Sequence, residues 1–305
     1  DTVFIERSNG MRYLSDIPIS YDDDGFLQLN LNSNSTVKFH GLEVGEIDVN
    51  NLVLHDAIDN YIYGTKNSDN LLGTSGNDYI DGWTEYHVDM LCVGMKSQHD
   101  ILNGQEGNDV LVGGISAHFC GGFNRDLFIF GENSGQDIIL DFTSNFELPG
   151  TINNYAHMDV LEIEENINGL SFRTAQEIID ISSDNIDGFA ELQLGGSSTV
   201  TLHGKSLSTI SPMHFRITPK IDSYIVGTDG NDALVGDDLN NYIKGSTDTL
   251  RRTADGYDIL DGGAGDDVLD GGVSVYAAPG YDINIYRLDK NYGDDKIFGF
   301  FAADV

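Results

Sequence analysis

The chain has few cysteines, no long apolar run and no signal-peptide pattern in its first residues. Its 305 residues include two cysteines, too few for a fold built from disulfides. No apolar run approaches the roughly 20 residues that a membrane-spanning helix needs. Residues 1–25 also lack the basic and then apolar pattern of a signal peptide. The sequence therefore predicts neither a disulfide scaffold nor membrane insertion.

Positive charge is also scarce. Lysine and arginine total 16 against 50 acidic residues, which gives a formal net charge of −34. Such a charge repels nucleic acid and anionic membranes, so we expect neither as a partner. It also opposes compaction unless cations neutralise it, and the composition alone thus predicts bound counter-ions.

Glycine, in contrast, is abundant, with 36 residues against five prolines. Glycine, Asp, Asn and Thr stand beside Val, Ile, Leu and Tyr, which is typical of short strands joined by many turns. The length is sufficient for two domains and a sizeable core. We expect an all-β protein without long helices.

The turns follow a nine-residue period, clearest in DILDGGAGDDVLDGG (258–272). Its unit GGAGDDVLD (262–270) matches the pattern G-G-x-G-x-D-x-U-x, in which U is a large apolar residue. Further units in this register are GTKNSDNLL (64–72), GTSGNDYID (73–81), GQEGNDVLV (104–112), GTDGNDALV (227–235) and GDDLNNYIK (236–244), the last with Asn241 in place of Asp. Unrelated glycine-rich loops are the alternative, and the common phase of the units favours the repeat.

The spacing gives each half of a unit its own role. The glycine-rich half forms a turn with inward carbonyls, and the x-U-x half is a short strand with one apolar side chain in the core. Successive units alternate sides of a flattened coil, so the Asp of one turn meets the carbonyls of the turn two units later. Such an oxygen cage, which includes few waters, suits Ca²⁺ better than Mg²⁺.

These nonapeptides resemble those of the RTX (repeats-in-toxin) calcium-binding proteins. The resemblance implies parallel β-rolls, calcium as the bound ion, and a secreted protein exported by type I secretion that stays unfolded at low cytoplasmic calcium. It also implies calcium ligation by the residues at the sixth position of each unit. These are Asp69, Asp78, Asp100, Asp109 and Asp126 in the first series, and Asp232, Asn241, Asp258, Asp267 and Asp282 in the second, where neutral Asn241 weakens one site.

RTX blocks often end in a β-rich tail, and this chain holds two related tails. GFAELQLGGSSTVTLHGKSLSTISPMHFRI (188–217) pairs with GFLQLNLNSNSTVKFHGLEVGEIDVNNLVL (25–54), and DVLEIEENINGL (159–170) pairs with DTVFIERSNGMR (1–12). We therefore expect two parallel β-rolls of calcium-binding nonapeptides alternating with β-rich, sandwich-like tails. The predicted domains are a tail over 1–58, a roll over 59–142, a tail over 143–221 and a second roll over 222–305.

Placing Asp1 after Val305 restores a complete block, because IFGFFAADV followed by DTVFIERSNG has the same sequence pattern as residues 139–169, with a shorter connection. The sequence thus predicts one repeat of a head-to-tail array, either as a tandem polypeptide or as an assembly of separate units. A boundary that fell there by chance is the alternative.

Both rolls carry insertions at their third and fifth turns, on one edge of the β-roll. In roll one these are residues 83–98 and 115–124, which contain both cysteines. Cys92 and Cys120 are thus plausible disulfide partners, with two free thiols, or a metal site with His87 or His118, as alternatives. Trp83, Tyr86 and Phe119 on this edge suggest a polysaccharide platform or a contact surface, or a cover for the insertion's own core.

The sequence contains no G-x-S-x-G, H-E-x-x-H or G-x-x-x-x-G-K motif, so we expect no enzyme. The prediction is an extracellular, calcium-dependent structural repeat unit of an adhesin, surface layer or fibre, whose partners are neighbouring copies. A polysaccharide-binding accessory module, either alone or appended to a secreted enzyme, is the alternative.

Overall fold

The structure is a computed structural model, and it describes most of the chain. The described residues are 2–7, 11–32, 35–40, 48–65, 68–82, 100–114, 126–144, 158–228, 230–245, 257–271, 284–288 and 292–298. Within them, short strands and turns dominate, and α1 (Ala175–Ile181) is the one α-helix. None of the described helices has the length and apolar character needed to cross a bilayer.

Roll one is built from strands that alternate between two parallel sheets. The first sheet contains β6 (Asn60–Tyr63), β8 (Asp78–Asp81), β10 (Val110–Val112) and β12 (Gln136–Ile139), and the second contains β7 (Asn70–Leu72), β9 (Ile101–Asn103) and β11 (Leu127–Phe130). Each nonapeptide thus adds one strand to one sheet and the next nonapeptide adds a strand to the other. This is the β-roll that the sequence predicts.

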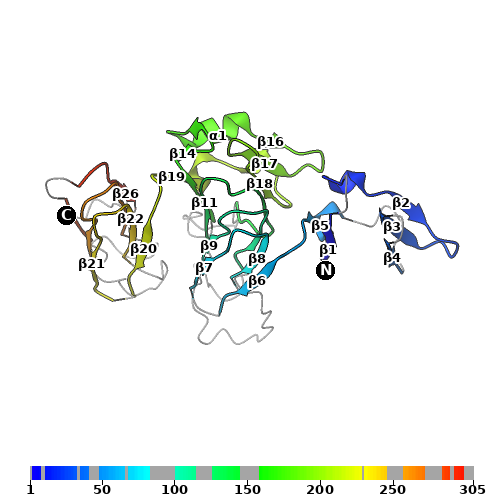
Figure 1. Cartoon of the computed structure of the whole chain (residues 1–305), viewed down its shortest axis with the longest axis horizontal. Coiled ribbons are helices and arrows are strands. Elements are labelled where there is room, and N and C mark those ends of the chain that lie inside the picture. The colour runs from blue at the N-terminus through cyan, green and yellow to red at the C-terminus, as the bar shows by residue number, and fades with distance from the viewer. Residues whose placement is uncertain are drawn as a thin grey trace, which may run out of the picture.

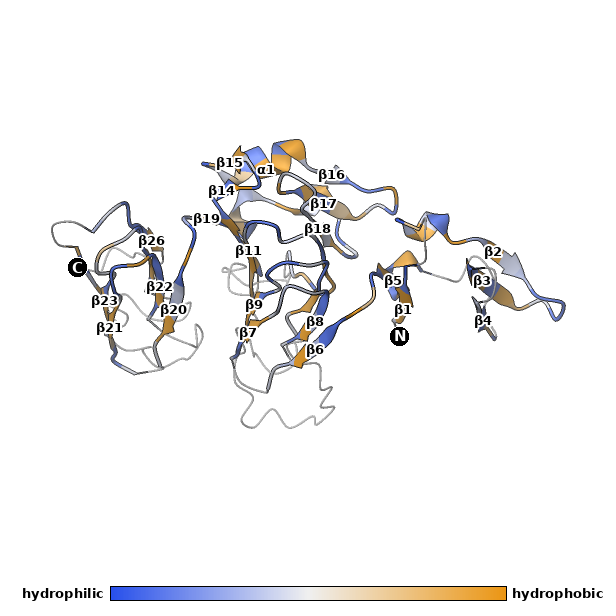
Figure 2. Ribbon diagram, viewed as in Figure 1, coloured by the Kyte–Doolittle hydropathy of each residue, from blue (hydrophilic) through white to orange (hydrophobic). Residues whose placement is uncertain are grey.

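One apolar side chain of each roll-one strand points between the two sheets. Ile80, Leu102, Leu111 and Phe128 are fully buried and belong to one cluster. Each stands at the centre of a three-residue x-U-x segment, as the strand period requires. Figure 2 shows hydrophobic residues along these strands and hydrophilic residues in the turns between them.

The sheets of roll one continue across residue 142 into the following tail. β13 (Val160–Glu164) pairs in parallel with β11, and β19 (Phe215–Thr218) pairs with β13. β18 (Thr199–Leu202) pairs in parallel with β12, followed by the antiparallel strands β17 (Ala190–Gln193) and β16 (Ser183–Asp184). The hairpin β14 (Asn166–Ile167) and β15 (Leu170–Ser171), together with α1, covers the end of the same core. Roll one and its tail are therefore one folded unit.

Roll two repeats this design with fewer buried residues. One sheet contains β20 (Ser223–Val226), β22 (Asn241–Lys244), β24 (Val268–Asp270) and β26 (Lys296–Phe298), and the other contains β21 (Ala233–Val235), β23 (Ile259–Asp261) and β25 (Ile285–Arg287). All neighbouring strands are parallel. Ile243, Leu260 and Leu269 form the buried cluster between the sheets.

The N-terminal segment forms its own small β structure. β1 (Val3–Glu6) pairs in parallel with β5 (Leu52–His55), and β2 (Ile19–Tyr21), β3 (Leu27–Asn32) and β4 (Ser35–Phe39) form an antiparallel sheet. The 3-10 turns Leu14–Asp16 and Val49–Asn51 connect these strands. Phe189 of the tail after roll one joins the buried cluster of this segment. Figure 1 shows roll one and its tail in the middle, with the N-terminal segment on one side and roll two on the other.

Candidate calcium site

The aspartates at the sixth position of the nonapeptides form two hydrogen-bonded rows in roll one. In one row, the backbone N–H of Asp69 donates to Oδ1 of Asp100 (2.7 Å), and that of Asp100 donates to Oδ1 of Asp126 (2.9 Å). In the other row, the N–H of Asp78 donates to Oδ1 of Asp109 (2.7 Å). One carboxylate oxygen of each acceptor is thus fixed by the strand before it, and the orientation of the other oxygen is set as well.

The second oxygen of the inner aspartates faces a cradle of glycine backbone. Within the described part of the chain, Oδ2 of Asp100 and Oδ2 of Asp109 are buried and receive no hydrogen bond. A Cβ on Gly104 would lie 2.0 Å from Oδ2 of Asp109, and a Cβ on Gly82 would lie 2.4 Å from Oδ2 of Asp100 and 2.5 Å from the carbonyl oxygen of Gly113. Only glycine leaves this space open, and carboxylate and carbonyl oxygens converge on it.

These buried carboxylates are costly to ionise without a counter-ion. Burial raises the pKa of Asp100 and the pKa of Asp109 to about 8. Burial likewise raises the pKa of Asp126 and that of Asp137 well above the usual range for aspartate. The cause is desolvation of the charged form, to which neighbouring aspartates add repulsion. A bound cation would remove both penalties.

The donor set fits calcium. Carboxylate and carbonyl oxygens are the hard ligands that Ca²⁺ prefers, and the glycine turns supply carbonyls in every unit. Across the described residues, no three His, Cys, Asp or Glu side chains come close enough to share one metal ion. Backbone carbonyls must therefore provide a large part of each coordination shell. The side chains would hold the ion through one carboxylate oxygen each, as the free Oδ2 of Asp109 allows.

The aspartates that begin the rows have different partners. Oδ2 of Asp69, Asp78 and Asp232 accepts the backbone N–H of the threonine four residues earlier, at 2.5, 2.6 and 2.7 Å. The threonine hydroxyls also donate to the same three oxygens. These carboxylates hold their own turn through hydrogen bonds, so they depend less on an ion than the inner aspartates.

Roll two has amides at two row positions: Asn241 stands where roll one has Asp78, which begins a row, and Asn284 stands where roll one has the inner Asp126. The N–H of Asn241 donates to Oδ1 of Asp267 (2.7 Å), and the N–H of Asp258 donates to Oδ1 of Asn284 (3.1 Å). The side-chain amide of Asn284 donates to the carbonyl oxygen of Gly271 (2.9 Å), and that of Asn241 donates to Oδ1 of Asp237 (3.1 Å). The amide of Asn284 thus satisfies a glycine carbonyl, whereas the carbonyl of Gly113 at the equivalent place of roll one faces the open cradle.

The structure places nine of the ten predicted ligands at the turns. Asp69, Asp78, Asp100, Asp109, Asp126, Asp232, Asn241, Asp258 and Asp267 all occupy the rows. Asp282 lies outside the described residues, and Asn284 holds the row position beside Asp258. Calcium ligation by each individual residue stays a prediction. Cys92, Cys120, Trp83, Tyr86 and Phe119 also lie outside the described residues.

Three further aspartates belong to the rows although the repeat pattern did not include them. Oδ1 of Asp137 accepts the N–H of Asp109 (2.9 Å), Oδ1 of Asp159 accepts that of Asp126 (2.9 Å), and Oδ1 of Asp295 accepts that of Asp267 (3.0 Å). Each stands at the start of a short, mostly apolar run, in QDII, DVLEI and DDKIF. An Asp before a short apolar run was the signal that could have identified them.

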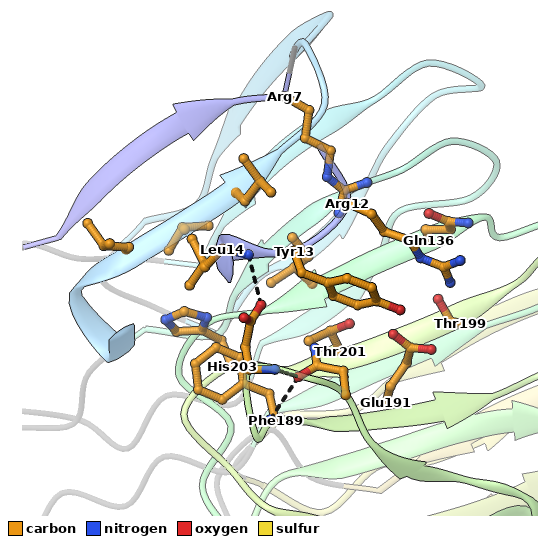
Figure 3. A pocket seen from close by; sticks show the side chains of 16 residues that line it. Arg7, Arg12, Tyr13, Leu14, Gln136, Phe189, Glu191, Thr199, Thr201 and His203 are labelled. Carbon is orange, nitrogen blue, oxygen red and sulfur yellow. Dashed lines mark hydrogen bonds between the residues drawn. The ribbon is translucent and has the colours of Figure 1, made fainter. Parts of the chain in front are cut away.

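Two hollows lie beside the rows rather than in them. Figure 3 shows the first, between the N-terminal segment and the hairpin of β17 and β18, where Arg7, Arg12 and Glu191 reach its wall. Its cavity volume is about 50 Å³, room for ordered water but less than a typical ligand site. The second, about 260 Å³, is lined by Glu132, Glu162 and other residues near the start of roll two.

Comparison with known families agrees with this geometry. The family of RTX calcium-binding nonapeptide repeats matches in four copies over residues 57–84, 97–116 and 252–273. These ranges contain Asp69, Asp78, Asp100, Asp109, Asp258 and Asp267. No curated protein matches the chain. RTX nonapeptides are calcium-binding motifs, and the cofactor of this chain is therefore calcium. The chain therefore contains RTX-type calcium-binding repeats, and these repeats form β-rolls.

Proposed function

We propose that this chain is an extracellular structural repeat unit of an adhesin, surface layer or fibre, which folds on calcium and joins neighbouring copies head to tail. The observation that supports the joining is the duplicated tail. Roll one is completed by the tail whose β13 and β18 extend its two sheets. The N-terminal segment has the same sequence pattern, yet it lies beside roll one and extends neither of its sheets.

Calcium supplies the folding switch in this proposal. RTX repeats typically occur in secreted proteins, which meet low calcium before export and high calcium after it. The inner carboxylates of both rolls are buried in rows, so the calcium-free folded state carries repulsion and desolvation that the unfolded chain avoids. An ion that binds only the folded state stabilises it by mass action. The chain would therefore fold only after export.

The proposed role is not enzymatic. Most buried aspartates of the rolls belong to the rows, and none of the catalytic motifs sought in the sequence is present. The net charge of −34 argues against nucleic acid as a partner. Copies of the same chain are the partner that the duplicated tail supports.

Calcium-dependent assembly of the purified chain tests the proposal. Light scattering and negative-stain electron microscopy in millimolar calcium should show chains of linked units, and excess EGTA should return monomers. Circular dichroism recorded on the same samples separates loss of assembly from loss of folding. A protein that folds in calcium and stays monomeric at high concentration would contradict the head-to-tail role.

A further inference from the structure

We propose that roll two is completed by the N-terminal segment of a second copy, with β1 of that copy pairing in parallel with β25 and β4 of that copy pairing in parallel with β26. This inference rests on the proposed head-to-tail function and specifies its contact surface. The partner is a second copy of this chain, and the interaction is the addition of strands to two sheet edges at once.

Roll one and its own tail provide the template. There, Leu127 of β11 lies opposite Val160 of β13, and Phe128 lies opposite Leu161. On the other sheet, Ile138 of β12 lies opposite Thr201 of β18, and Ile139 lies opposite Leu202. The tail therefore adds one strand to each sheet, and its apolar side chains close the core between them.

The recipient strands of roll two have the same position and register as those of roll one. Leu260 lies opposite Tyr286 of β25, as Leu102 lies opposite Phe128 of β11. Leu269 lies opposite Ile297 of β26, as Leu111 lies opposite Ile139 of β12. Among the described strands, none follows β25 or β26 on the outer side of its sheet. These two edges are where roll one receives its tail.

The donor strands in the N-terminal segment match those of the tail. Val3 of β1 lies opposite Leu52 of β5, as Leu161 of β13 lies opposite Phe215 of β19. Leu29 of β3 lies opposite Val37 of β4, as Leu192 of β17 lies opposite Val200 of β18. Within the described part of the chain, β5 is the only strand that pairs with β1, and β3 is the only strand that pairs with β4. One edge of each donor strand is thus available for an edge of roll two.

In such an array, each tail would also contact the roll that follows it, and this type of contact already exists within the chain. Glu162 of β13 faces roll two, where the hydroxyl of Tyr224 donates to its Oε1 (3.2 Å). Phe4, at the equivalent position of β1, packs against Tyr79 of roll one, with ring centroids 5.9 Å apart. A tail thus contacts the roll that follows it in both places. A second copy that completes roll two would carry its own roll one in the corresponding place, and the array would continue.

The template fixes the register of the joint. Ile285 should lie opposite Thr2 of the second copy, as Leu127 lies opposite Val160, and Arg287 should lie opposite Phe4 of the second copy, as Ile129 lies opposite Glu162. Ile285 and Phe4 are 41% and 43% exposed in the single chain. The joint would bury both side chains. Removal of their apolar surface from water would stabilise the joint.

Disulfide trapping of this register tests the inference. In a full chain with Cys92→Ser and Cys120→Ser, the pair Ile285→Cys and Thr2→Cys should give a ladder of covalent oligomers under oxidation in calcium, and monomers in EGTA. The matched control pairs Arg287→Cys with Thr2→Cys, which changes the register by two residues on the same face. That offset is about 7 Å along the strand, beyond the reach of a disulfide. The control should therefore stay uncrosslinked.

A second pair guards against a variant that fails to fold. Arg287→Cys with Phe4→Cys keeps the predicted register, and circular dichroism in calcium checks that each variant is folded. Oligomers by light scattering, with crosslinks in the control pair or in neither register, would overturn the strand pairing and leave the head-to-tail role intact. Folded monomers without any oligomer, in the variants and in the unmodified chain, would overturn both.

Discussion

The two rolls share one architecture but differ in what fills their turns. In the inner positions of roll one, Asp100, Asp109 and Asp126 are buried carboxylates. In roll two, Asn284 occupies one such position and Asn241 stands where roll one has Asp78, and both amides donate to neighbouring oxygens. An N–H donor and a cation can therefore satisfy the same set of oxygens. We therefore expect the calcium demand of a roll to depend on the residue at this one position of each turn.

The two contacts between a tail and the roll that follows it differ in a similar way. At roll two, Arg216 forms a buried ion pair with Asp270 (2.7 Å), and Tyr242 donates to the same carboxylate (3.0 Å). At roll one, Phe4 packs on Tyr79 at the equivalent place. One contact is ionic and the other is aromatic, although the strands correspond residue by residue. The arrangement therefore follows from the strand geometry rather than from one type of interaction.

Removal of calcium should have the largest effect and should separate the two rolls. In excess EGTA, the buried carboxylates of roll one have no counter-ion. The strands of roll one should therefore lose all protection from hydrogen exchange. Roll two has asparagine at two positions of its rows, so β22 and β24 should retain more protection from hydrogen exchange. Hydrogen exchange read by mass spectrometry on peptides of each roll measures this. Equal protection of both rolls in EGTA would contradict the role given to Asn241 and Asn284.

Filling one cradle of roll one should have the next largest effect. Gly104→Ala places a Cβ 2.0 Å from Oδ2 of Asp109, so the carboxylate or the turn must move. We expect a loss of up to roughly 3 kcal/mol of stability in calcium, as for other overpacked sites. Thermal melting in saturating calcium measures it. Gly230→Ala is the control, because the nearest atom to its Cβ would be 3.6 Å away, and this variant should melt like the unmodified chain.

The ionic contact at roll two should make stability depend on pH. Burial raises the pKa of Glu162 to about 7, and the charge of Arg216 only partly offsets this. In the unfolded state Glu162 has its ordinary, lower pKa. Between the two pKa values, Glu162 therefore keeps its proton in the folded state and has lost it in the unfolded state. Stability should therefore fall as the pH rises through this window, by roughly 2 kcal/mol between about pH 5.5 and pH 8.

Glu162→Gln should abolish this part of the pH dependence and raise the melting temperature at about pH 8 in saturating calcium. Glu191→Gln is a suitable control, because Glu191 of β17 is only half-buried, and its substitution should leave the pH slope unchanged. A pH slope that persists in Glu162→Gln would assign the effect to other groups.

Exchange of Asp and Asn at positions of the rows should have the smallest effect of these changes. Asp109→Asn should remove one bound calcium and raise the calcium concentration needed for half-folding about tenfold, or about 1.4 kcal/mol. Asn241→Asp should do the reverse in roll two, with lower stability in EGTA and one more calcium bound. Isothermal titration calorimetry counts the ions. Unchanged stoichiometry in both variants would separate these residues from ion binding.

Much of the fold could be predicted from the sequence because its period is local. The nine-residue spacing predicts the turns, the alternation of strands and the inward apolar residues, and Ile80, Leu102 and Leu111 lie where it places them. The rows could be predicted in part, since Asp100 and Asp109 stand at regular positions. Asp137, Asp159 and Asp295 join the same rows from segments outside the nonapeptide register, where the only local signal is an Asp before a short apolar run.

The sequence by itself determined the repeat, the strand class, the acidic charge and the need for cations, because each depends on residue type and spacing along the chain. The tertiary structure alone decided that the tail completes roll one, because the pairing of β13 with β11 and of β18 with β12 joins segments far apart in the sequence. It also decided which carboxylates lack a hydrogen-bond partner, because that depends on the backbone packed around them. Oδ2 of Asp109, for example, lies against the Gly104 turn and receives no hydrogen bond from the described residues.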